Sequence, residues 1–155
     1  PKKGLSHILT IIRELLAFKP SEGKTDFATA MVFMNNVIKK RSTCFLITDG
    51  FGTFDQSMHI AAGRHDMSCI LINDKSEFEL CNMGLVNFVD SESGKRIWID
   101  TCDAQTRKAF GAYRPNQRTD CIKELTKHGI DNTAILCGED YIPQLAKLFA
   151  KKERR

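Results

Sequence analysis

A short apolar run that stops at an acid and a glycine constrains the fold of this chain more than any other stretch. Thr43–Thr48 is preceded by polar residues and is too short for an isolated helix. Such a run predicts a buried strand of a parallel sheet. Asp49 and Gly50 follow it directly. Because ligands of open α/β sheets bind beyond the carboxyl ends of the strands, Asp49 is the first candidate for a functional residue.

The stretches after this run predict a parallel crossover unit. A helix expected at about Phe54–Arg64 separates the first strand from a second one at Met67–Ile72. Strand, helix and strand joined by short links form a right-handed parallel crossover. Asn132–Cys137 predicts a third core strand, so the sheet is expected to be mainly parallel. Leu85–Val89 and Arg96–Asp100 flank a polar turn and predict an antiparallel hairpin that extends the fold.

Apolar residues that recur at intervals of three and four predict amphipathic helices along the rest of the chain. Aspartate and threonine at the start of such a stretch satisfy the first free backbone amides of a helix, and an internal proline interrupts it. The expected helices are Gly4–Ala17, Phe27–Ile38 with Thr25 or Asp26 as its cap, about Asp103–His128 with a break or kink near Pro115, and a last helix capped by Asp140.

The composition favours one domain in a reducing compartment. With 155 residues and no shift in composition, the chain is expected to form a single domain over residues 1–155. Its formal charge of +4 is spread over helix ends and one terminus, without interleaved aromatic residues, which argues against a nucleic-acid partner. No stretch approaches the roughly 20 apolar residues of a membrane helix. A cytoplasmic chain without a membrane segment is therefore expected.

The six cysteines show neither a CxxC pair nor the spacing of a zinc site. Cys44, Cys69 and Cys137 lie inside apolar, strand-like runs. A free cysteine in such a run behaves as a small buried hydrophobe. We therefore expect all three to be buried and reduced.

Asp49 and Thr25 each allow a functional and a structural interpretation. A carboxylate beyond a parallel strand is a hard oxygen ligand for Mg²⁺ or a similar cation, but Asp49 can equally accept backbone N–H groups in the turn to Gly50. Spacing alone favours neither interpretation. Thr25 precedes a helix, where its hydroxyl can bind a ligand or cap the helix, and capping is the more common role.

An enzyme is the alternative function. The run from Asp49 to Thr53 resembles the phosphoryl-transfer motif of haloacid-dehalogenase-like enzymes, although Ile47 stands where that motif has its aspartate nucleophile. The resemblance implies an Mg-dependent phosphoryl-transfer or nucleotide-handling enzyme that uses Asp49.

Other side chains give weaker signals. The four histidines lie in different predicted elements, and each is expected to be a surface or packed residue. Trp98 and Phe88 on the hairpin could form an exposed binding surface, but we expect them to pack against the sheet or a helix. None of these residues predicts a catalytic site.

Several stretches, in order along nearly the whole chain, together resemble a known family. The matching pieces are Lys3–Leu9 with Ile12–Leu16, Lys24–Asp26, Lys40–Ser42, Arg64–Asp66, Gly84–Val86, Asp90–Gly94, Asp100–Thr101 with Asp103, and Asp140–Pro143 with Leu145 and Phe149. No single piece is specific, but the ordered set is similar to the bacterial von Willebrand factor A-like family catalogued as domain of unknown function fifty-eight.

The resemblance implies an α/β, Rossmann-like three-layer sandwich with a mainly parallel sheet. It implies a noncatalytic protein-interaction or adaptor domain that works with a MoxR-type AAA+ ATPase in complex assembly or stress response. Domains of the von Willebrand factor A type bind a cation through an Asp-x-Ser-x-Ser motif, a loop threonine and a later aspartate. By position, Thr25 matches the threonine and Asp49 matches the last aspartate.

This sequence departs from the family where the main metal ligands should be. It contains no Asp-x-Ser-x-Ser motif, and the family's first strands should precede Pro1, so the domain is expected to be incomplete at its N-terminus. Two oxygen ligands hold Ca²⁺ or Mg²⁺ poorly, because such sites need around six oxygens. We expect no bound cation in this chain and a divalent cation, Mg²⁺ or another, in the full-length protein. Missing strands would also expose a sheet edge and favour a homodimer.

Overall fold

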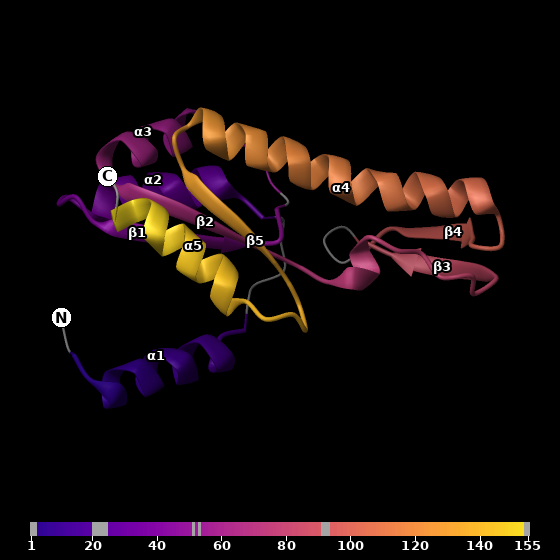
Figure 1. Ribbon diagram of the computed structural model, residues 1–155, viewed down its shortest axis with the longest axis horizontal. Coiled ribbons are helices and arrows are strands. Elements are labelled where there is room, and N and C mark those ends of the chain that lie inside the picture. Colours follow the sequence, from indigo (N-terminus) through magenta and orange to yellow (C-terminus); the bar gives the residue numbers. More distant parts are fainter. Residues whose placement is uncertain (1–2, 20–24, 51, 53, 91–93, 154–155) are drawn as a thin grey trace.

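The computed structural model describes residues 3–19, 25–50, 52, 54–90 and 94–153, without the side chain of Arg114. The described parts of the chain form five helices, five strands and a short 3₁₀ helix (Figure 1). Their bounds are α1 Leu5–Ala17, α2 Phe27–Val37, β1 Thr43–Thr48, α3 Gln56–Arg64, β2 Asp66–Asn73, η1 Lys75–Glu77, β3 Leu85–Val89, β4 Arg96–Asp100, α4 Ala104–Lys127, β5 Asp131–Leu136 and α5 Ile142–Glu153.

The central sheet has three parallel strands in the order β1-β2-β5. Thr43 pairs with Asp66 at the start of β1, and Ser68 pairs with Asp131 at the start of β5. Strands β3 and β4 form a separate antiparallel hairpin, whose predicted bounds are confirmed. Residues 91–93 of the predicted turn lie outside the described residues. The α/β, Rossmann-like class with a mainly parallel sheet and a hairpin is therefore confirmed.

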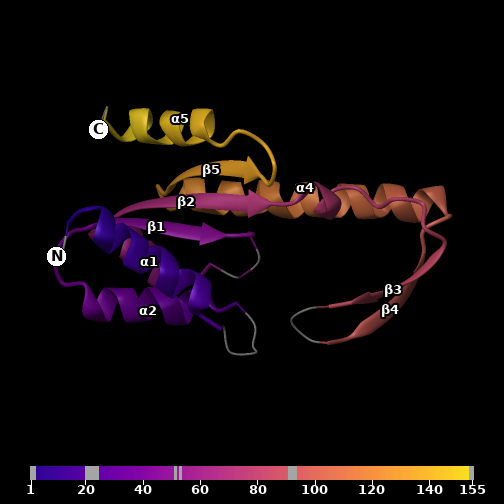
Figure 2. The same cartoon turned by 90° about the horizontal axis from the view of Figure 1, so that it is seen from below.

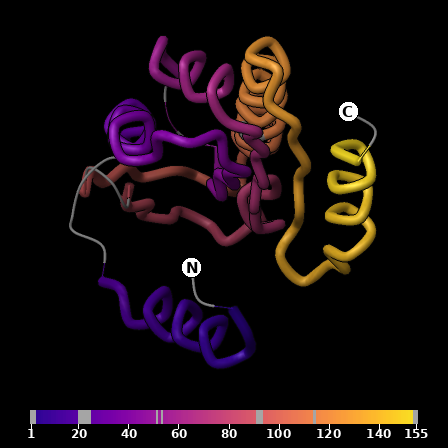
Figure 3. The backbone as a smooth tube through the Cα atoms, turned by 90° about the vertical axis from the view of Figure 1, so that its left-hand side faces the viewer, coloured from indigo at the N-terminus to yellow at the C-terminus, as the bar shows by residue number. Residues whose placement is uncertain are grey.

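Helices cover the two faces of the sheet unequally (Figures 1 and 3). On one face, side chains of α2, α3 and α4 join Met67, Cys69 and Leu71 of β2 in the hydrophobic core. On the other face lies α5, whose Phe149 ring contacts Phe45 of β1 with the ring centroids 5.8 Å apart. Alternation along β1 and β2 explains this division, because successive side chains of a strand point to opposite faces.

Aspartate side chains begin four of the helices, among them α5, where the predicted cap Asp140 accepts the backbone N–H of Ile142 over 3.0 Å. The carboxylate of Asp26 accepts the backbone N–H of Thr29 at the start of α2, that of Asp55 accepts Ser57 at the start of α3, and that of Asp103 accepts Thr106 at the start of α4. Each carboxylate satisfies an amide that has no partner within its helix. Asp26, and not Thr25, is thus the cap of α2.

The helix α4 is continuous from Ala104 to Lys127, although Pro115 lies inside it. The helix is therefore not broken at this proline, and the expected kink stays a prediction. A proline removes one backbone donor and crowds the carbonyl four residues earlier, which here belongs to Gly111. Because Gly111 has no side chain, its backbone can shift to accommodate the proline ring. The helix continues in regular turns on both sides of Pro115.

The expected burial of three cysteines is only partly correct. All six cysteines are free, and Cys69 is buried while Cys44 is half-buried. Cys137 is exposed and follows Leu136, the last residue of β5, although its backbone amide still donates to the carbonyl of Asn73 in β2 over 2.8 Å. Cys121 of α4 is buried in the core instead.

Candidate functional site

The carboxyl ends of β1 and β2 lie at the same end of the sheet, which we call the carboxyl edge (Figure 2). Asp49 follows β1 there, and Asn73 is the last residue of β2. The side-chain amide of Asn73 donates a hydrogen bond to the backbone carbonyl of Asp49 over 3.0 Å. It also lies 3.4 Å from the Glu77 carboxylate. Asn73 is only 4% exposed, so a buried amide holds the end of one strand against the other.

The Asp49 side chain itself is exposed. The hydroxyl of Thr48 donates to the Asp49 carboxylate over 3.3 Å and accepts the backbone N–H of Gly50 over 3.1 Å. The hydroxyl of Thr48 therefore satisfies the Gly50 amide. The Asp49 carboxylate lies at the surface, at the carboxyl end of β1.

The loop after Asp49 packs against the start of α2. Gly52 has a φ of 140°, and an added Cβ at this position would lie 2.5 Å from the Phe27 ring. Phe27 is the first residue of α2 and follows Thr25 by two positions. This contact places the start of α2, which Thr25 precedes, beside the loop that follows Asp49.

A hollow of about 270 Å³ lies beside this loop. Gly50, Gly52 and Phe54 line one side of it, and polar residues of α4 line the other, among them Asp120 and Glu124. Cys121 also lines the hollow, and burial, followed by the nearby charge of Asp49, raises the pKa of its thiol. The thiol is therefore protonated at neutral pH and unsuited to act as a nucleophile.

No group of three or more His, Cys, Asp and Glu side chains among the described residues is placed to hold a metal ion. The pair Thr25 and Asp49 supplies one neutral and one charged oxygen ligand, which is a small part of the shell that Mg²⁺ requires. The role of these two residues as metal ligands stays a prediction.

Asn73 is the residue of this edge that sequence reasoning missed. In the sequence it follows the apolar run Ile70–Ile72 as Asp49 follows the run Thr43–Thr48, and in the structure it is the last residue of β2. A polar residue directly after a buried parallel strand is the signal that could have identified it. The same logic that singled out Asp49 applies to every strand of the sheet.

A second concave surface lies between the hairpin and α4. We call it the hairpin cleft, a cavity of about 750 Å³ whose apolar lining comes from Phe88, Ile97, Ile99, Phe110 and Tyr113. The rings of Phe88 and Phe110 contact each other across it, with centroids 6.3 Å apart. Glu77, Asp90 and Lys95 add charged groups to its lining.

The expected packing of the hairpin aromatics is correct for Phe88 and wrong for Trp98. Trp98 is 64% exposed. It pairs with Asn87 across the hairpin, so both side chains lie on the face opposite to Phe88 and Ile97. No described helix covers that face, because α4 lies along the other one.

No described helix is both long and apolar enough to cross a membrane.

Comparisons with known proteins identify sequence relatives of this chain. An uncharacterized protein of Mycobacterium avium, MAV169, is 26% identical over 132 residues, which cover 84% of this chain and 77% of that protein. The uncharacterized protein Rv1480 of Mycobacterium tuberculosis is 22% identical over 157 residues, which cover 99% of this chain and 49% of that protein. The chain therefore spans about half the length of this second relative. No solved structure gives a significant match. A family profile described as protein of unknown function DUF58 matches residues 1–120, and the chain belongs to this family.

Proposed function

We propose that this chain is a noncatalytic protein-interaction domain that binds a partner protein with the hairpin cleft and the carboxyl edge of its sheet. The hairpin cleft is the observation that carries this proposal. Its apolar side chains are open to solvent, with Ile97 61% and Tyr113 60% exposed. Exposed apolar patches rimmed by polar residues mark protein-interaction surfaces.

The position of the hairpin supports this role. Strands β3 and β4 extend beyond the central sheet beneath the N-terminal half of α4 (Figure 2). Leu85 and Trp98 on the outer face of the hairpin are 65% and 64% exposed. Both faces of the hairpin thus offer apolar side chains, and a partner protein would remove them from water at a gain of about 25 cal/mol per Å².

The proposal also names the partner protein and a cation that the two proteins would share. We propose a MoxR-type AAA+ ATPase as the partner, acting with this domain in complex assembly or stress response, on the resemblance of the chain to its family. The exposed carboxylate of Asp49 would share a divalent cation, Mg²⁺ or a similar ion, with the partner in the full-length protein. Thr25 would supply a hydroxyl ligand at the same edge, and a partner carboxylate would complete the shell.

Co-purification of the intact protein with such an ATPase tests the proposal. Ile97→Glu places a charge in the hairpin cleft and is expected to weaken binding about tenfold or more, because a buried charge without a partner is strongly unfavourable. Asp49→Ala and chelation of divalent cations are both expected to weaken binding. Glu153→Ala, which removes an exposed acid near the opposite end of the sheet, is the matched control and is expected to bind as the wild type does.

The outcomes separate the parts of the proposal. Binding that is unaffected by Ile97→Glu would remove the hairpin cleft from the interface. Binding that is indifferent to Asp49→Ala and to chelation would remove the cation. A screen for phosphatase and nucleotide-hydrolysis activity is expected to give no turnover, whereas turnover that Asp49→Ala abolishes would establish the enzymatic alternative.

A further inference from the structure

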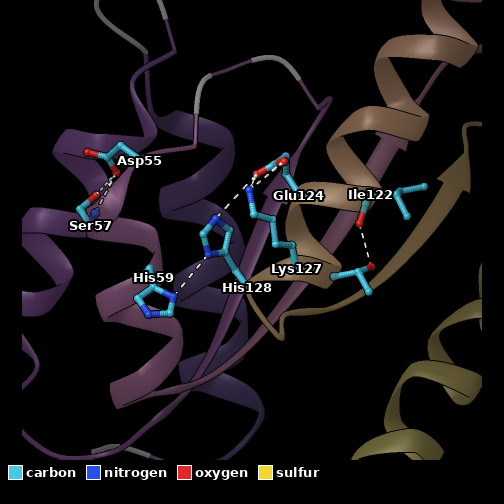
Figure 4. Close-up of polar contacts among 8 residues, drawn as sticks. Asp55, Ser57, His59, Ile122, Glu124, Lys127 and His128 are labelled. Carbon is cyan, nitrogen blue, oxygen red and sulfur yellow. Dashed lines mark hydrogen bonds and ion pairs between the residues drawn. The ribbon is translucent and has the colours of Figure 1, made fainter.

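Two histidines that are 69 positions apart in the sequence meet at the junction of α3 and α4 (Figure 4). His59 lies in α3, and His128 directly follows α4 as its C-cap. Their Nδ1 atoms are 3.5 Å apart, and the ring planes meet at 56°. The two rings therefore direct the same kind of nitrogen at a shared point from two different elements.

The separation of the two nitrogens is compatible with two arrangements. It is that of a long hydrogen bond between the rings, in which one nitrogen donates and the other accepts according to the tautomer. Two imidazole nitrogens bound to one Zn²⁺ at about 2.0–2.1 Å and at a tetrahedral angle lie about 3.3 Å apart. The rings are therefore also close enough to bind one cation together when both nitrogens are unprotonated.

The Glu124 carboxylate lies behind the ring of His128. It is 3.8 Å from Nε2 of His128, on the side of the ring that faces away from His59. A carboxylate in this position favours a proton on Nε2 and leaves the lone pair of Nδ1 free to bind a metal. Metal-binding histidines commonly have such a carboxylate behind the ring, which orients the imidazole and raises its basicity.

The charges and the exposure of the site permit a cation to enter. Lys127 lies nearby, but its ammonium is 3.4 Å from the Glu124 carboxylate, which offsets its charge. His59 is exposed, and the side chain of His128 retains 17% of its accessible surface. Solvent therefore reaches both rings, and water or a ligand from another molecule can fill the remaining coordination positions.

We propose that His59 and His128 form a binding site for a divalent transition metal such as Zn²⁺, with Glu124 as a positioning residue. This site is separate from the carboxyl edge at Thr25 and Asp49 and does not depend on the function proposed above. No third His, Cys, Asp or Glu of the described residues completes it, so the site is open. The bound metal would link α3 to the end of α4.

Calorimetric titration of the intact protein with Zn²⁺ alone tests this site. We expect one Zn²⁺ per chain and at least tenfold weaker binding in both His59→Ala and His128→Ala. Glu124→Gln is expected to weaken binding by a smaller factor, because the amide still accepts the Nε2 proton without a charge. His7→Ala, which removes a histidine from α1, is the matched control and should bind as the wild type does.

Two further readouts keep the test decisive. Tetrahedral Co²⁺ absorbs visible light, so the wild type with Co²⁺ should show this band and His59→Ala should not. Zn²⁺ should raise the unfolding temperature of the wild type but not of His59→Ala, because a ligand that binds the folded state stabilises it. Because His59 is exposed, the His59→Ala variant is expected to fold as the wild type does. Zn²⁺ affinity unchanged by either histidine substitution, or reduced equally by His7→Ala, would overturn the proposal.

Discussion

Gly52 is a residue at which backbone conformation and packing impose the same requirement. Its φ of 140° lies in a region that residues with a side chain rarely adopt. The Phe27 ring also occupies the space that a Cβ would need, at 2.5 Å. This contact fixes the loop after Asp49 against the start of α2 and so shapes the carboxyl edge of the sheet.

Replacement of this residue is therefore expected to be costly. We predict that Gly52→Ala lowers the free energy of unfolding by roughly 1–3 kcal/mol through backbone strain and the displaced Phe27 ring. Urea denaturation measures the change. The control is Gly63→Ala in α3, where a Cβ meets no atom within 4 Å. That variant should gain about 0.5–1 kcal/mol from the higher helix propensity of alanine, and an equal loss in both variants would contradict the prediction.

At the scale of elements, the start of α4 depends on one carboxylate. Asp103 accepts hydrogen bonds from the backbone amides of Gln105 and Thr106 and from the Thr106 hydroxyl, the last over 2.6 Å. The Thr106 hydroxyl, followed by the Thr106 and Gln105 amides, lowers the pKa of Asp103 below its ordinary value of 3.8. Asp26 and Asp74 show the same pattern, with pKa values lowered by Thr29 and Ser76.

These caps predict a loss of stability in acid. A carboxyl whose pKa is lower in the folded state stabilises the fold above its unfolded pKa, and this contribution is lost as the pH falls through the folded pKa. The free energy of unfolding should therefore fall below about pH 4. Asp103→Asn keeps a capping side chain without the charge and should show a smaller fall, measured by urea denaturation from pH 6 to pH 2.5. Thr106→Val should reduce the fall as well, and an unchanged pH dependence in both variants would contradict this explanation.

At the scale of the whole molecule, the apolar surface is unevenly covered. No residue of α1 is buried, and its large apolar side chains are 44% to 82% exposed, with Leu5, Leu15 and Leu16 above 70%. The helix lies apart from the central sheet (Figures 1 and 3). On the sheet itself, Ile47 of the edge strand β1 is 62% exposed on the face that α5 covers in part. These surfaces favour contact with further protein.

A homodimer through the exposed edge of β1 is the prediction at this scale. Ile47→Lys introduces a charge on this edge strand and should shift the protein toward the monomer in sedimentation experiments. Because Ile47 is largely exposed, its replacement should change the free energy of unfolding by no more than about 0.5 kcal/mol. Leu125→Ala, in a core residue with 0% exposure, should instead cost about 2–5 kcal/mol and leave the contact surface intact. A wild type that sediments as a monomer at all concentrations would contradict the prediction.

The sequence alone determined the kinds of elements and most of their positions. The hairpin strands, the aspartate caps and the three parallel strands depend on spacing and capping within a few residues, and these are local properties of the chain. For the same reason Asp49 could be placed at the end of β1 before its surroundings were known. The family resemblance added the prediction that these elements form a Rossmann-like fold.

Only the tertiary structure decided which of these elements meet. The contact of Asn73 with Asp49, the convergence of His59 with His128 and the exposure of Trp98 each depend on how distant segments pack. Local periodicity contains no information about such contacts, because they join residues many positions apart. The continuity of α4 through Pro115 also differs from the local expectation that a proline interrupts a helix. The helical turns on both sides of the proline continue across it.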